Sequence, residues 1–338
     1  MLNNQDFAQS QAKSLDSLTS GEVLAFPRTP TKTDPKIIFY QDARNRLLVT
    51  IVKIEGAYAP STIRAYRSNF EFFINYCEKQ NLEVLPCAAS TLASYISHLS
   101  NQNLKSASIR LASAAVAAIH RFNRFEDPSK DPDVVLELRK MFRKLGRYQQ
   151  QATAINKHTL EKLIAVTDNS LKGYRDRALL LTAYDSLCRR SELAALRVED
   201  VFNVNSRNGI QIRLRKSKTD QSGDGRWITL SEKTHHAINA WIRESKITSG
   251  FLFRGITKYE SPTQEIAGAQ INRIYKQLAI RAEIDSKLVQ HISGHSLRVG
   301  SAQDLLASGA SIVMIMNRGR WTKTDTVMRY VENVQPAL

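Results

Sequence analysis

From about Leu47 onward, apolar residues recur every three or four positions, which is the spacing of an amphipathic α-helix. The clearest stripe runs from Ile63 to Cys77 and predicts a helix over residues 61–78, with Ser61 as its N-cap after Pro60. We therefore expect an all-helical unit in this part of the chain. The same spacing predicts its other helices: from about residue 90, over residues 106–122 and over residues 133–146.

The pattern changes after a stretch without apolar periodicity. Two more helices are predicted over residues 157–166 and 174–186. Apolar positions then alternate with polar ones around Ile212 and Ile228, which indicates two strands joined through a turn-rich segment. Helical spacing returns from Thr234. The fold class predicted for the whole chain is mainly α with a small antiparallel β-sheet.

These changes of pattern divide the chain into four segments. The first is polar, contains three closely spaced prolines and is expected to be a flexible tail. The helical unit follows it, and a short linker separates that unit from the mixed α/β unit. The predicted segments are the tail at residues 1–40, the helical unit at 41–146, the linker at 147–155 and the second unit at 156–338.

The charge of the chain narrows the class of partner. Its 338 residues include 48 lysines and arginines against 32 aspartates and glutamates, a formal net charge of +16. Such a balance favours a polyanionic partner, with nucleic acid ahead of an anionic membrane, although charge also serves solubility. Both units are basic, so both are expected to touch a duplex if DNA is the partner.

Other classes are disfavoured by what the sequence lacks. The three cysteines form no C-x-x-C pair, so neither a disulfide framework nor a zinc site is expected. No apolar run is long enough to span a bilayer, and the first residues do not resemble a secretory signal. The chain contains no G-x-x-x-x-G-K-[ST], H-E-x-x-H or G-x-S-x-G motif. We expect a cytoplasmic protein whose chemistry uses side chains alone, with no metal and no cofactor.

Three separate stretches could carry such chemistry. Arg189 and Glu192 are three residues apart among apolar neighbours, where the simpler interpretation is a surface salt bridge. His295 and Arg298 have the same spacing at the start of a predicted helix, whose N-terminus suits a phosphate. The third stretch runs over residues 317–331 and holds two aromatic residues, Trp321 and Tyr330, each of which alone would more often belong to a core.

Together and in this order, the three stretches resemble the tyrosine site-specific recombinases, or phage integrases, and most nearly their Cre-like branch. The resemblance covers roughly residues 45–335. It implies that the helical unit is a core-binding domain that binds DNA and that the second unit is the catalytic domain. The segment over residues 215–219 resembles the basic β-hairpin of the family, in which Lys218 matches the hairpin lysine.

The resemblance also implies a role for each residue. Arg189 and Arg298 would neutralise the non-bridging oxygens of the scissile phosphate, because guanidinium groups offer planar forks of donors. Tyr330 would attack to form a 3′-phosphotyrosine, with His295 as general base or proton relay. The remaining roles are protonation of the 5′-oxygen by Lys218, packing or N–H donation by Trp321, and orientation of Arg189 or His295 by Glu192.

Contacts with DNA outside the active site are expected on exposed helix faces and helix starts. Gln270 and Arg273 lie on a segment that resembles the helix with which the family enters the major groove, and their side chains suit adenine and guanine edges. The other candidates lie in the helical unit: Arg64, Arg67, Lys105, Ser106, Ser108 and Arg110.

By resemblance, the partner is double-stranded DNA with inverted-repeat recognition arms, bound by a homotetramer on two sites. The protein would be nucleoid-associated in a prokaryote, or carried by a phage or plasmid. Cre-like proteins dock a further C-terminal helix into a neighbouring protomer, and residues 331–338 are short for that helix. Three other functions stay open: a Xer-type dimer resolvase, a type IB topoisomerase and a non-catalytic architectural DNA-binding protein.

Overall fold

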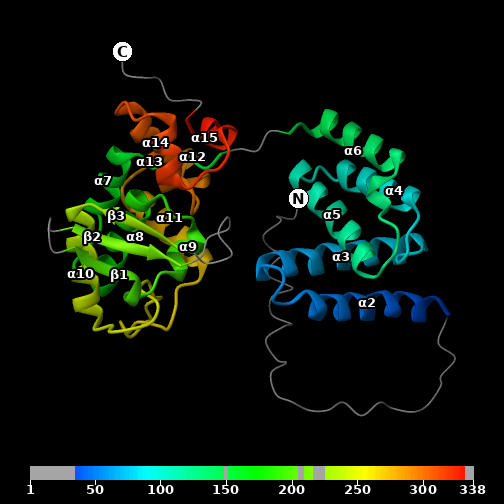
Figure 1. The fold of residues 1–338 in the computed structure, drawn as a ribbon, viewed down its shortest axis with the longest axis horizontal. Coiled ribbons are helices and arrows are strands. Elements are labelled where there is room, and N and C mark those ends of the chain that lie inside the picture. The colour runs from blue at the N-terminus through cyan, green and yellow to red at the C-terminus, as the bar shows by residue number, and fades with distance from the viewer. Residues whose placement is uncertain (1–34, 148–150, 205–208, 216–224, 332–338) are drawn as a thin grey trace, which may run out of the picture. The chain divides into compact units, whose positions relative to one another are not determined.

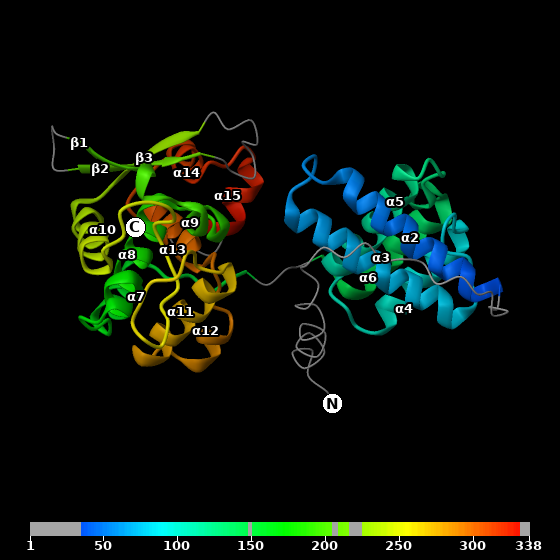
Figure 2. The same ribbon diagram turned by 90° about the horizontal axis from the view of Figure 1, so that it is seen from below.

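The computed structural model describes residues 35–147, 151–204, 209–215 and 225–331. Contacts between Cα atoms divide the chain into two compact units, with the boundary between Gln149 and Gln150. Each unit is described by itself below and can be followed in Figures 1 and 2. The predicted tail lies outside the described residues up to residue 34.

The described part of the first unit is entirely helical, as the spacing of its apolar residues predicts. Phe70, Phe73, Ile74 and Cys77 are all buried in its core, which confirms the apolar stripe of the helix predicted over residues 61–78. The helices are α2 (Pro35–Ile54), α3 (Pro60–Gln80), α4 (Ala89–Asn101), α5 (Ser106–Phe122), the short 3₁₀ helix η1 (Pro128–Lys130) and α6 (Pro132–Leu145).

Two helix starts in the first unit differ from the prediction, and in the second unit α8 (Leu171–Ser186) begins three residues before the predicted position 174. Helix α3 has Ala59 as its N-cap and Pro60 at its first position, so Ser61 lies inside the helix. Proline suits this position because the first helical N–H has no partner within the helix. Helix α2 begins at Pro35 rather than near Leu47, and the last residues of the predicted tail are therefore helical. Exposed apolar side chains on α2, including Val49 and Val52, blur its amphipathic pattern.

One histidine is fully enclosed in the first unit. The N–H of Cys87 donates to Nε2 of His120 over 3.0 Å, so the proton of the neutral ring lies on Nδ1. Nδ1 then donates to the carbonyl oxygen of Val116 over 2.8 Å. Burial lowers the pKa of His120, because the charged ring would be removed from water. The backbone therefore satisfies both ring nitrogens of a neutral His120.

The second unit combines helices with a small sheet, which confirms the predicted fold class. Its strands pair antiparallel in the order β1-β2-β3, with Ile212 opposite Ile228. Helices α8 and α10 contact this sheet and each other (Figure 2). The strands are β1 (Val201–Val204), β2 (Gly209–Leu214) and β3 (Arg226–Leu230), and the alternating pattern predicted only the second and third.

The regular elements of this unit outside the sheet are helices. No helix in the described part of the chain is long and apolar enough to cross a membrane. The helices are α7 (Lys157–Ala165), α8 (Leu171–Ser186), α9 (Arg190–Ala195), the 3₁₀ helix η2 (Val198–Asp200), α10 (Glu232–Ser245), α11 (Gly268–Arg281), α12 (Ser286–Gln290), α13 (Ser296–Ala307), α14 (Ile312–Gly319) and α15 (Thr324–Val331).

Part of the stretch predicted as a linker packs on the second unit. The N–H of Ile155 donates to the carbonyl oxygen of Ser296 over 3.0 Å, and Ile155 is fully buried. Its own carbonyl oxygen lies so close to Gly300 that a Cβ there would approach it to 1.9 Å. Glycine at position 300 therefore allows this backbone to pass directly over helix α13.

Candidate active site

Helix α13 begins where the sequence predicts and places its two candidate residues at its start. His295 is the N-cap, and Arg298 lies in the first turn. Arg298 is 1% exposed, and its guanidinium donates to the carbonyl oxygens of Leu187 over 2.6 Å and of Gly319 over 2.5 Å. These two bonds tie α13 to the ends of α8 and α14.

The first candidate pair caps helix α9. Nη1 of Arg189 donates to Oε1 of Glu192 over 2.7 Å, and the backbone N–H of Arg189 donates to Oε2 over 2.8 Å. Glu192 is only 5% exposed. The pair is therefore not the surface salt bridge that was the simpler interpretation of its spacing, because its carboxylate is buried.

The two aromatic candidates lie next to Arg298. The guanidinium carbon of Arg298 is 4.3 Å from the centroid of the Trp321 ring, which is a cation–π distance. The Tyr330 ring packs on the Trp321 ring, with 5.2 Å between the two centroids and an angle of 40° between the two planes. A Cβ at Gly319 would lie 1.9 Å from the Trp321 ring, so glycine is required for the ring to lie here.

A third arginine in the cluster was not singled out from the sequence. Arg320 is 7% exposed and donates to Oε2 of Glu192 over 3.0 Å. It also donates to the carbonyl oxygens of Ser186 and Leu187, over 3.0 Å and 3.2 Å. The next residue, Trp321, was singled out from the sequence. No pattern in the sequence indicates that the side chain of Arg320 turns inward.

The charges of the cluster act on one another. Burial, Arg189 and Arg320 all lower the pKa of Arg298, whereas the Tyr330 side chain acts in the opposite direction. Burial alone would raise the pKa of Glu192, but Arg320 and the hydrogen bonds from Arg189 lower it. Glu192 is therefore a carboxylate near neutral pH, and it is shared between two guanidinium groups.

His295 is exposed to solvent but closely surrounded by other groups. This partial desolvation, followed by the charges of Arg298, Arg190 and Arg189, lowers its pKa. The ring is therefore neutral near pH 7. The arrangement thus offers a neutral base, a tyrosine and an excess of guanidinium groups, which suits chemistry on an anionic phosphate.

The other candidates are only partly placed. Lys218 lies outside the described residues. In the first unit, the Ser106 side chain is buried. Arg67 forms an ion pair with Glu71 over 3.1 Å. The candidates exposed to solvent are Arg64, Arg67, Lys105, Ser108 and Arg110 in the first unit and Arg273 on α11, where Gln270 is half-buried.

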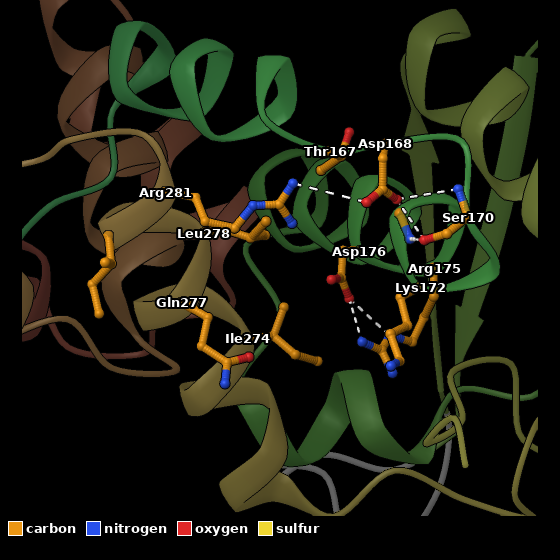
Figure 3. Close-up of a pocket in the computed structure, with 12 residues that line it drawn as sticks. Thr167, Asp168, Ser170, Lys172, Arg175, Asp176, Ile274, Gln277, Leu278 and Arg281 are labelled. Atoms are coloured by element: carbon orange, nitrogen blue, oxygen red, sulfur yellow. Dashed lines mark hydrogen bonds and ion pairs between the residues drawn. The ribbon is translucent and has the colours of Figure 1, made fainter. Parts of the chain in front are cut away.

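Figure 3 shows a pocket of about 380 Å³ between α8 and α11. Its wall includes the ion pair of Arg175 and Asp176, whose side chains lie 2.6 Å apart. Asp168 and Arg281 face each other across 3.8 Å at its rim. None of the candidate residues lines this pocket, so the arginine cluster is a separate feature. No group of three or more potential metal ligands occurs within the described ranges.

Two family models match the chain. The model of the phage integrase family covers residues 153–335, more than half of the 338 residues. The model of the phage integrase N-terminal SAM-like domain covers residues 47–126. The first match contains all three stretches of the candidate site, and the second lies within the helical unit.

Curated proteins of this kind are similar over most of the chain. The integrase/recombinase XerD homolog of Selenomonas ruminantium is 27% identical over 291 residues, which cover 83% of this chain and 84% of that protein. Recombinase Cre of Escherichia phage P1 is 25% identical over 309 residues, which cover 87% and 90%. The two identities are too close to assign the chain to either branch.

Solved structures share the fold. The XerH site-specific recombinase bound to palindromic difH substrate matches with a TM-score of 0.58 and 15% identity, over 90% of this chain and 87% of that one. A lambda integrase dimer bound to a COC′ core site also matches with a TM-score of 0.58. It is 13% identical, over 88% of this chain and 96% of that one. At such identities the likeness concerns the fold alone.

Proposed function

Because the chain belongs to the phage integrase family and is a tyrosine recombinase, we propose that Tyr330 is the nucleophile with which it cuts DNA. One observation carries this proposal. Arg298 lies over the Trp321 ring at 4.3 Å, the Tyr330 ring packs on the same ring at 5.2 Å, and the charge of Arg189 acts on Arg298. Binding of one phosphate by the two arginines would present it to the tyrosine hydroxyl.

The proposed cleavage step needs no metal and no ATP. The Tyr330 hydroxyl loses its proton to neutral His295, and its oxygen forms a bond to phosphorus while the bond from phosphorus to the 5′-oxygen breaks. Lys218 donates a proton to that 5′-oxygen. The product is a 3′-phosphotyrosine that keeps an ester bond, so a 5′-hydroxyl from another strand reseals the DNA by the reverse step.

We further propose that the active form is a homotetramer on two DNA sites with inverted-repeat arms. Exchange of all strands between two duplexes requires four cleavages, and each protomer supplies one active site. The first unit would hold the flanking duplex with its basic residues, and its match to the N-terminal SAM-like domain supports this role. Binding by so many basic groups should weaken steeply with salt.

The test is covalent trapping on suicide substrates drawn from a random DNA library selected for binding. We expect the wild-type protein to form an adduct and Tyr330→Phe to bind the same sites without one. An adduct formed by Tyr330→Phe would refute the assignment of the nucleophile. Supercoil relaxation without crossover products would instead indicate a topoisomerase. Full activity of Tyr330→Phe would indicate an architectural protein.

The branch of the family is decided by a second experiment. We propose the Cre-like mode, in which one protein recombines its own sites. Purified protein alone, mixed with two copies of the selected site, should then yield crossover products. A requirement for a second recombinase would favour the Xer type, as the similarity to the XerD homolog allows.

A further inference from the structure

Arg320 occupies a backbone position that is usually glycine. Helix α14 ends in a Schellman motif, in which the N–H of Trp321 donates to the carbonyl oxygen of Met316 over 3.0 Å. Arg320 is the left-handed residue of this motif, with φ of 57°. Glycine adopts this conformation without the steric cost that a side chain brings. Leu187 and Lys246 adopt the same conformation after α8 and α10, so it is the contacts of the Arg320 side chain that set this helix end apart.

The glycine of this segment stands one position earlier, where the site needs it. Gly319 leaves room for the Trp321 ring, and its carbonyl oxygen accepts a hydrogen bond from Arg298. The helix end therefore combines a glycine used for close packing with an arginine in the strained position. The Arg320 side chain points into the protein rather than into solvent, and the residue is only 7% exposed.

The Arg320 guanidinium contacts the same groups that hold the two phosphate-binding candidates. It shares the carbonyl oxygen of Leu187 with Arg298, whose Nη1 lies 2.6 Å from that oxygen. It also shares the carboxylate of Glu192 with Arg189. Nε of Arg320 is buried and has no hydrogen-bond partner within the described part of the chain.

Glu192 is the centre of this arrangement. Nη1 of Arg189 binds its Oε1, whereas Arg320 and the Arg189 backbone N–H bind its Oε2. Both oxygens are thus fixed, and the carboxylate cannot rotate toward a single partner. Arg320 also balances the negative charge of Glu192, so that charge does not neutralise Arg189 alone. Arg189 therefore keeps both its direction and its attraction for an anion.

We propose that Arg320 is a positioning residue, which holds Glu192 through Oε2 so that Arg189 presents its guanidinium to the scissile phosphate. This inference rests on the proposed function, because it assigns Arg320 a role in that cleavage step. Arg320 acts through Glu192 and does not itself touch the phosphate. Loss of its side chain should therefore slow cleavage more than it weakens binding of DNA.

The first experiment compares Arg320→Gly, Arg320→Lys and a control in single-turnover adduct formation. Arg320→Gly removes the charge but suits the left-handed backbone, so it should fold. We expect its cleavage rate to fall roughly 10- to 100-fold, as for other residues that orient a ligand-binding group, with little change in the affinity for the site. Arg320→Lys keeps the charge and should recover part of the rate.

Arg318→Ala is the matched control. Arg318 precedes the same helix end, is exposed and donates to the carbonyl oxygen of Asp185 over 3.1 Å. Its removal takes away one positive charge without touching Glu192. We expect Arg318→Ala to cleave at the wild-type rate, and a loss as large as that of Arg320→Gly would show that net charge alone is responsible.

A double-mutant cycle with Glu192→Gln tests the path of the effect. If Arg320 acts through the carboxylate, Arg320→Gly should cost much less in the Glu192→Gln background than in the wild type. Protonation of Glu192 should add a further loss of cleavage rate at a lower pH than the acid limb set by His295, and in Arg320→Gly this further loss should begin at higher pH, because Arg320 lowers the pKa of Glu192. It should stay in place in Arg320→Lys. A general packing defect would produce neither result.

The outcomes separate this inference from the proposed function. If the wild-type protein forms no adduct, the proposed function fails and the inference falls with it. If the wild-type protein forms an adduct but Arg320→Gly cleaves equally fast with the same pH profile, only the inference is overturned. Equal costs of Arg320→Gly in both backgrounds would overturn it as well.

Discussion

Each unit contains a histidine whose pKa is lowered, but the surroundings of the two rings differ. His120 is fully buried in the helical unit, and the backbone satisfies both of its nitrogens. His295 is open to solvent at the start of α13, and nearby arginines add to the effect of its partial desolvation. Burial alone favours the neutral form of His120. For His295, partial burial and the charges of nearby arginines both favour it.

The wider difference concerns how each unit balances its polar groups. The helical unit encloses His120 with partners of its own. The second unit places Arg189, Arg298 and Arg320 around one carboxylate, Glu192, and so holds excess positive charge. Such charge is costly without a partner. A unit that keeps it is suited to bind an anion, whereas in the described part of the helical unit no buried side-chain nitrogen or oxygen lacks a hydrogen-bond partner.

The largest effect should come from the arginine that joins the parts of the site. Arg298→Lys keeps one charge but cannot donate to Leu187 and Gly319 together while lying flat on Trp321. We expect single-turnover adduct formation to fall about 10³-fold, in the range seen when one donor to a reacting oxyanion is removed. Affinity for the selected DNA site should change much less.

Stability serves as the control for Arg298→Lys. The three tryptophans of the chain, Trp227, Trp241 and Trp321, all lie in the second unit, so their fluorescence reports the unfolding of that unit alone. The variant should keep a cooperative fluorescence transition. A folded Arg298→Lys that cleaves within tenfold of the wild type would contradict the role given to the guanidinium fork.

The next effect should appear in the helical unit. His120→Ala removes the acceptor of the Cys87 N–H and opens a cavity in the core. We expect the free energy of unfolding of this unit to fall by about 2–4 kcal/mol. Far-ultraviolet circular dichroism should show an earlier helical transition, while the tryptophan transition of the second unit stays in place.

His98→Ala is the matched control for this prediction. His98 is exposed on α4 of the same unit, where it contacts Gln102 and the Tyr76 ring. Its loss should cost less than about 1 kcal/mol, as for most surface substitutions. If both histidine variants destabilise the unit equally, then burial of His120 is not the source of its effect.

The contrast between the units also explains what the sequence could predict. The apolar stripe ending at Cys77 predicts the position of α3, because a helix with one buried face has apolar residues every three or four positions. The start of α13 at His295 and Arg298 was also predicted, but their spacing of three residues alone did not identify a site, and their assignment came from the resemblance to a family. Strand β1 was missed, because its four residues are too few to show alternation.

Arg320 could not be predicted for a different reason. Its contacts join α14 to residues more than 120 positions earlier, at Ser186, Leu187 and Glu192. Periodicity reports only which face of an element is buried. Whether a charged side chain after a helix turns inward depends on a tertiary partner, and the left-handed backbone of Arg320 is not recorded in any spacing.

Acid should weaken the helical unit through His120. The folded pKa of this ring lies below the unfolded value of 6.5, so the unfolded chain binds more protons as the pH falls below that value. The contribution of neutral His120 is complete above pH 6.5 and is lost progressively below it, by at most about 1.4 kcal/mol per pH unit. Unfolding monitored by circular dichroism should lose this dependence in His120→Ala.

The smallest effect should be the response of cleavage to mild acid. His295 must be neutral to accept the proton of Tyr330, and its folded pKa lies below 6.5. More than half of the rings are then still neutral at pH 6.5, so the single-turnover rate should drop less than about twofold between pH 8 and 6.5. Below the pKa of His295 the rate should fall about tenfold per pH unit.

Arg190→Ala removes one of the charges that lower the pKa of His295 and should move the acid limb toward higher pH. A wild-type rate that is already halved near pH 7, or an acid limb that Arg190→Ala leaves unmoved, would show that the arginines do not keep His295 neutral. The two histidines would then differ only in burial.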